Sequence, residues 1–161
     1  MNNLGTALRI LGEHRKGPRT LEQSVAAYRS ALSERTRERV PHDWAMTQNN
    51  LGAALHKLGS RKEQPQNLIA AIEAYQQALE EWTRERGAVT WAMTTANLAG
   101  AREALAELTS DVDQVHAALS DFQTVGSVFR EASHAQYYQL VTEQIALLRK
   151  LEKQISLAEE A

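Results

Sequence analysis

The stretch NNLG at Asn49–Gly52 decides the fold, because the chain contains it more than once. NNLG also stands at Asn2–Gly5, and the related ANLA stands at positions 96–99. A constant offset of 47 positions relates these stretches, and it also relates WAMT at Trp44 to WAMT at Trp91. Self-similarity at a fixed period indicates a protein built from structural repeats.

The composition predicts an ordinary globular chain of 161 residues, with 43% hydrophobic and 24% charged residues. It contains no cysteine, which excludes disulfides and thiolate metal sites and fits a cytoplasmic location. No apolar run reaches the roughly 20 residues that span a bilayer, so we expect no membrane segment. A formal net charge of −2 argues against a nucleic-acid binder.

Apolar residues within each period recur at helical spacing, as at Leu51, Leu55 and Leu58. Gly59 and Pro65 bracket a polar connection to a second helix. The pattern therefore predicts two helices per period. Seven helices are expected, over residues 2–12, 20–39, 44–59, 67–87, 91–109, 112–132 and 135–158.

The two helices of a period carry the patterns LGxxL and AxxxYxxA, at Leu51, Gly52, Leu55, Ala71, Tyr75 and Ala78. This combination resembles the tetratricopeptide repeat, in particular the kinesin-light-chain type and bacterial forms with a long period. Arg102 departs from it, because the other repeats have leucine at that position.

The resemblance implies an all-α fold, a right-handed superhelical solenoid of antiparallel helix pairs that forms a single domain over residues 1–161. Its parts would be an N-terminally truncated repeat over 1–43, full repeats over 44–90 and 91–133, and a C-terminal capping helix over 134–161.

No catalytic constellation is present, so we expect a protein that is not an enzyme and that needs neither cofactor nor metal. Asp113 and His116 lie one turn apart, but two ligands do not make a zinc site. In ERTRER at 34–39, Glu34 lies three residues from Arg37 and Glu38 lies three residues from Arg35, which predicts local ion pairs.

Three tryptophans invite a ligand-cage interpretation, which the repeat disfavours. Trp44 and Trp91 recur on the leucine stripe and are expected in the core, whereas Trp82 replaces Arg35 of the preceding period and is expected to be partly exposed.

One amide recurs at the same place in every period: Asn3, Asn50, Asn97 and then Gln144. Asparagine is a mediocre helix former, so helix propensity does not explain this amide ladder. A carboxamide donates and accepts, and can pair with both polar groups of a peptide bond. The resemblance implies that Asn3, Asn50 and Asn97 line a concave groove and hold an extended peptide. Gln144, at the same place in the last helix, is a further candidate for binding the partner. The alternative is an internal ladder in which each amide bonds to a neighbouring helix.

Further groove positions surround the amides and are expected to select ligand side chains. They are Arg9, Met46, Asn49, His56, Lys57, Met93 and Glu103. Arg9 and Lys57 would favour acidic ligand residues, and the methionines offer adaptable apolar contacts. The expected function is a protein–protein interaction module that binds a partner segment.

Two other functions remain open at this point. Leu4, Leu8 and Leu11 have no preceding helix to cover them, which suits a structural module that self-associates through its N-terminal repeat into a homo-oligomer. An excess of basic residues over 1–43 and of acidic residues over 102–161 would favour contact between unlike ends. A start inside a repeat, with Met1 at the place of Gln48, also suits a regulatory segment of a larger signalling protein.

Overall fold

The computed structural model describes residues 2–14 and 18–160, so Met1, residues 15–17 and Ala161 lie outside the description. Within those two ranges all regular structure is α-helical, which confirms the all-α prediction. No helix there has a stretch that is both long and apolar enough to cross a bilayer.

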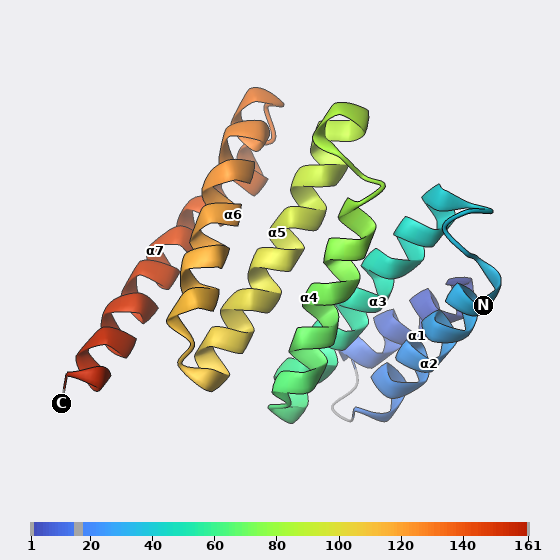
Figure 1. Ribbon diagram of the computed structural model, residues 1–161, viewed down its shortest axis with the longest axis horizontal. Coiled ribbons are helices and arrows are strands. Elements are labelled where there is room, and N and C mark those ends of the chain that lie inside the picture. Colours follow the sequence, from blue (N-terminus) through green and yellow to red (C-terminus); the bar gives the residue numbers. More distant parts are fainter. Residues whose placement is uncertain (1, 15–17, 161) are drawn as a thin grey trace. The chain divides into compact units, whose positions relative to one another are not determined.

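Seven helices form over the described residues, as predicted. They are α1 (Asn2–His14), α2 (Arg19–Glu34), α3 (Pro41–Lys62), α4 (Pro65–Leu79), α5 (Arg84–Thr109), α6 (Val112–Glu131) and α7 (Ala135–Glu159). The chain divides into two compact units, Met1–Trp82 with α1–α4 and Thr83–Ala161 with α5–α7. Within each unit the helices pack mainly on their neighbours in sequence (Figure 1). That the two units form one domain stays a prediction.

The paired helices α3 and α4 approach closely where α3 has no side chain. A Cβ atom added to Gly52 would lie 2.9 Å from the ring of Tyr75, and one added to Gly59 would lie 2.8 Å from Leu68. Tyr75 and Leu68 are almost fully buried. The two glycines are therefore needed for helix packing.

The same arrangement recurs between α1 and α2. An added Cβ would lie 2.7 Å from Tyr28 at Gly5 and 2.9 Å from Leu21 at Gly12. In both helix pairs of the first unit, glycines therefore lie opposite large side chains, and this complementary packing lets the two helices approach closely.

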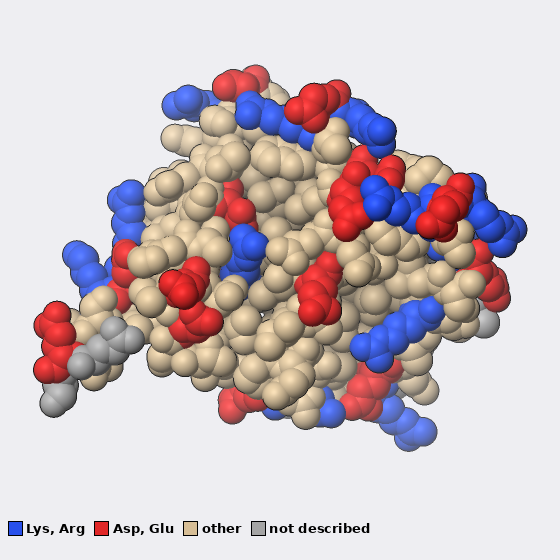
Figure 2. All heavy atoms as spheres, viewed as in Figure 1, with Lys and Arg blue, Asp and Glu red and all other residues tan. Residues whose placement is uncertain are grey.

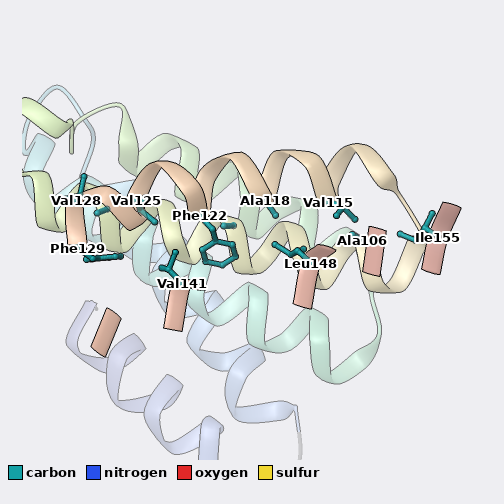
Figure 3. Close-up of a cluster of buried hydrophobic side chains, with 12 residues drawn as sticks. Ala106, Val115, Ala118, Phe122, Val125, Val128, Phe129, Val141, Leu148 and Ile155 are labelled. Atoms are coloured by element: carbon teal, nitrogen blue, oxygen red, sulfur yellow. The ribbon is translucent and has the colours of Figure 1, made fainter. Parts of the chain in front are cut away.

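In the second unit, alanines stand at the positions of these glycines, and the large residues opposite them also differ. At the equivalent positions stand Ala99 with Phe122, and Ala106 with Val115. All four are buried in one apolar cluster, which also contains Leu148 of α7. Figure 3 shows Val115, Ala118 and Phe122 along one face of α6, with Leu148 opposite.

Arg102 stands where the other repeats have leucine, and its partner Asp121 stands where the second repeat has alanine. Its guanidinium forms an ion pair with Asp121 on α6, and both side chains are largely buried. The equivalent residues of the second repeat are Leu55 and Ala74, both buried. An apolar contact in one repeat is therefore replaced by an ion pair in the next.

The ends of several helices differ from the prediction. The second helix ends at Glu34 instead of residue 39, and the fourth ends at Leu79 instead of residue 87. The prediction of local ion pairs for Arg37 is wrong, because this residue pairs with Glu80 and with Glu81, the latter at 2.6 Å. These contacts hold the segment after α2 in a turn beside the end of α4.

Trp44 and Trp91 are less buried than predicted, whereas Trp82 is partly exposed, as predicted. Trp44 and Trp91 are half-buried, each beneath an arginine at the equivalent repeat position. The guanidinium carbon of Arg37 lies 5.5 Å from the Trp44 ring centre, and that of Arg84 lies 5.9 Å from Trp91. Trp82 is half-buried and donates a hydrogen bond to His42 at 3.4 Å.

Charged side chains of both signs are interspersed on the face drawn in Figure 2. Several form exposed ion pairs within the first unit, such as Lys62 with Glu22 at 2.9 Å and Arg35 with Asp43 at 3.5 Å. Exposed pairs of this kind stabilise a fold by only about 0–1 kcal/mol each.

Replacing Gly59 tests the close helix approach. Gly59→Ala should destabilise by about 0–2 kcal/mol, because overpacking costs ~1–3 kcal/mol and better helix propensity returns about 1. Adding Leu68→Val recreates the Ala106–Val115 pair. The free energy of unfolding of the double variant should therefore fall by at least about 1 kcal/mol less than the two single substitutions predict when their effects are added. Urea unfolding followed by far-UV circular dichroism measures this. Gly87→Ala, where an added Cβ meets nothing nearer than 4.0 Å, is the control. Additive losses would contradict the packing account.

Replacing Arg102 and Asp121 tests the buried ion pair. Arg102→Leu alone should cost about 2 kcal/mol at pH 7, because it leaves the Asp121 carboxylate desolvated and unpaired. Burial raises the pKa of Asp121, so the loss should shrink at pH 4.5 as that carboxyl takes up a proton. Arg102→Leu with Asp121→Ala should be no less stable than wild type. A double variant as unstable as the single one, by thermal and urea unfolding, would argue against this interpretation.

Candidate functional site

The ladder amides lie on the first helix of each repeat. In the first unit, Asn3 on α1 is exposed and Asn50 on α3 is half-buried. In the second unit, Asn97 on α5 is exposed and Gln144 on α7 is half-buried. Within each unit these first helices touch, α1 against α3 and α5 against α7. A ladder that runs on from one unit to the other stays a prediction.

The three asparagines and the glutamine differ in their bonding. Across residues 2–14 and 18–160, the side chains of Asn3, Asn50 and Asn97 form no hydrogen bond. The amide of Gln144, with its nitrogen turned towards Glu103, donates to both carboxylate oxygens at 3.0 Å. The structure thus brings together Glu103 and Gln144, two residues that the sequence analysis assigned to the ligand.

Asn49, next to the ladder on α3, is half-buried. Its side-chain oxygen is buried and has no hydrogen-bond donor among the described residues. A buried acceptor without a donor costs about 1–3 kcal/mol, so this oxygen would gain from a donor supplied by a ligand or by water.

Arg9 and His56 occupy equivalent positions on α1 and α3, and both are half-buried. Burial raises the pKa of the Tyr75 hydroxyl, and the charge of Arg9 opposes that rise. Burial and the neighbouring Lys57 lower the pKa of His56, so its ring stays neutral at pH 7. Lys57 itself is exposed.

The two methionines differ in exposure. Met46 on α3 is half-buried, and Met93 on α5 is 41% exposed. Met93 can therefore contact a ligand without rearrangement, whereas Met46 offers only part of its side chain.

Glu103 and Glu107 line a hollow between α5 and α7, with a volume of about 210 Å³. Leu147, Lys150 and Leu151 form its other wall. Burial, and then the charge of Glu107, raise the pKa of Glu103 to about 7. This carboxyl is therefore half-protonated near neutral pH.

Among the side chains that the structure describes, no three histidine or acidic residues gather in a way that could hold a metal ion. His116, which the sequence analysis weighed with Asp113, has its Nε2 atom 2.8 Å from Glu152 on α7.

Sequence reasoning missed several polar contacts. One is the hydrogen bond from Gln48 on α3 to Gln77 on α4, and another is the Arg102–Asp121 pair. Both pairs lie at positions where the repeats differ, at Gln48 and Thr95 and again at Ala74 and Asp121. Positions that change together between repeats were the signal that could have found them.

No family model, no curated protein and no solved structure matches this chain.

The raised pKa of Glu103 predicts a pH-dependent stability. Its folded pKa of about 7 lies above the unfolded value of 4.5, so its protonation stabilises the fold below pH 4.5 and that contribution is lost as pH rises through 7. Glu103→Gln should therefore stabilise the protein at pH 8 by about 1 kcal/mol, after allowance for solvent screening, and by less at pH 4.5. Urea unfolding at both pH values measures the difference, with the exposed Glu131→Gln as control. A gain that is equal at both pH values would contradict the assignment.

Proposed function

We propose that this chain is a protein-interaction module of the tetratricopeptide type, which holds an extended partner segment against the first helices of its repeats. The observation that carries the proposal is the ladder of carboxamides at Asn3, Asn50 and Asn97. They recur at one repeat position and have no hydrogen bond within the described residues. An internal ladder would use these groups, whereas a ligand-binding ladder leaves them available.

Each asparagine would pair with the N–H and C=O groups of one residue of an extended peptide. Extended chain rises about 3.3 Å per residue and packed helices stand roughly 8–10 Å apart, so Asn3 and Asn50, on the touching helices α1 and α3, would hold residues three positions apart. Gln144 is assigned a structural role here, because Glu103 already accepts from it. The module binds and does not catalyse, and it needs no cofactor.

Side chains beside the ladder would select the sequence of the partner. The cations of Arg9 and Lys57 favour acidic residues, and His56 stays neutral beside them. Met93 offers an exposed, adaptable apolar contact and Met46 a partly covered one. In the second unit the carboxyl of Glu103 would instead favour a cation. The ligand is therefore a protein segment with mixed charge.

Self-association is the second candidate, and the exposure of α1 favours it. Leu4 and Leu11 are 53% and 43% exposed, whereas the equivalent Leu51 and Leu58 on α3 are 7% and 5% exposed. An uncovered apolar stripe of this kind can form an interface between two copies. Light scattering over a range of concentrations separates this candidate from a monomeric peptide binder.

Removing two ladder amides tests the proposal. Asn50→Ala with Asn97→Ala should reduce partner binding at least tenfold, because each lost pair of hydrogen bonds removes about 1–2 kcal/mol. The measurement is an affinity pull-down from lysate of the source organism, quantified by mass spectrometry and followed by calorimetry with the captured protein.

The matched control removes two amides of similar chemistry from the second helices. Gln23 on α2 and Gln76 on α4 are exposed, and their replacement by alanine should leave binding unchanged. Circular dichroism verifies that both double variants are folded. Equal capture by wild type and by the folded ladder variant would sink the peptide-binding mechanism.

A further inference from the structure

A groove recurs between the second helix of one repeat and the first helix of the next, once in each unit. In the first unit, α2 and α3 border a groove of about 420 Å³, and in the second unit, α6 and α7 border one of about 320 Å³. Their linings share four repeat positions, two periods apart: Leu32 and Gly126, Thr36 and Arg130, Trp44 and Tyr138, Gln48 and Thr142.

The first groove has an aliphatic group and carboxylate groups from its own unit. Leu32 is half-buried and contributes an aliphatic side chain to the lining. Arg37 at the rim stacks over Trp44 and forms ion pairs with Glu80 and Glu81. The chain itself thus supplies a leucine to the lining of this groove and carboxylates to the arginine at its rim.

The second groove lacks the aliphatic group. Gly126 stands where the first two repeats have leucine, at Leu32 and Leu79. A Cβ atom added to Gly126 would touch only Val141, at an ordinary contact distance of 3.5 Å. Val141 and Ile145 of α7 form an apolar wall beside it. The missing side chain leaves space for one that comes from outside.

The second groove also lacks the carboxylate. Arg130 is its one charged lining residue, and the Arg130 side chain forms no ion pair or hydrogen bond within residues 2–14 and 18–160. The hydroxyls of Ser127 and Thr142 donate to backbone oxygens of their own helices at 3.0 and 2.9 Å. The guanidinium is therefore the group that a carboxylate from outside would meet.

We propose that the groove between α6 and α7 docks a partner-protein segment that inserts a leucine-type side chain over Gly126 and places a carboxylate on Arg130. Such a segment supplies the two groups that Leu32 and the Glu80–Glu81 pair supply within the first unit. An aliphatic anchor in a pocket with a charged pair at its rim is a common way to combine affinity with specificity. The site uses none of the ladder residues, so it stands independently of the peptide-binding mechanism above.

The probes are acetylated, amidated hexapeptides that contain one leucine and one glutamate, spaced by one, three or four positions, in an alanine background. Each is titrated into the full chain, and the methyl resonances of Val141 and Ile145 are followed by NMR. At least one spacing should bind. Its Leu→Ala twin and its Glu→Gln twin should each bind at least threefold more weakly.

Gly126→Leu recreates the lining of the first unit and should weaken binding at least tenfold while keeping the fold. Gly126→Ala adds only a methyl group and serves as the matched control, with binding within about twofold of wild type. Arg130→Gln should erase the difference between the glutamate peptide and its glutamine twin, whereas Arg149→Gln, exposed on α7 and outside the lining, should preserve it.

Three outcomes would overturn the proposal. They are a lack of binding by all the hexapeptides, undiminished binding to a folded Gly126→Leu variant, and equal affinities of wild type for the glutamate and glutamine peptides. Self-association that Gly126→Leu abolishes would assign the groove to a second copy of the chain instead. Loss of ladder binding in Asn50→Ala/Asn97→Ala with intact hexapeptide binding would separate the two sites.

Discussion

The close approach of the two helices within a repeat is the constraint on which the other contacts depend. At Gly52 and Gly59 the backbone of α3 meets the side chains of Tyr75 and Leu68, at distances that leave no room for a Cβ atom. Because protein interiors are close-packed, a small residue must stand where a large one presses. This complementarity sets the spacing of α3 and α4. It thereby positions the outward face of α3, which carries Asn50.

Differences between the repeats then decide what each copy of a position does. The apolar pair Leu55–Ala74 becomes the ion pair Arg102–Asp121, without loss of the local helix packing. Leu32 becomes Gly126, so the groove between α6 and α7 lacks the leucine side chain that lines the groove between α2 and α3. A repeat supplies the same backbone several times, so a change of one or two side chains gives a new surface on an existing frame.

Much of the fold and part of the candidate site were predictable. The 47-residue offset and the helical spacing of Leu51, Leu55 and Leu58 predicted the number of helices and the paired packing, because these signals are local. The helix ends were not predictable to the same degree. The segment after α2 leaves the helix and pairs Arg37 with Glu80 and Glu81, which are more than forty positions away in the chain. No local pattern distinguishes that pairing from one within the helix.

The sequence by itself determined the all-α class, the period and the recurrence of the amides, since each depends on which residue types recur at a regular spacing. Only the tertiary structure decided the bonding of those amides. It pairs Gln144 with Glu103 and leaves Asn97 without a hydrogen bond within the described residues. It also decided that Glu103 has a raised pKa. The physical reason is that hydrogen bonding and desolvation depend on which side chains of separate helices meet. The spacing of residues along one helix does not specify those contacts.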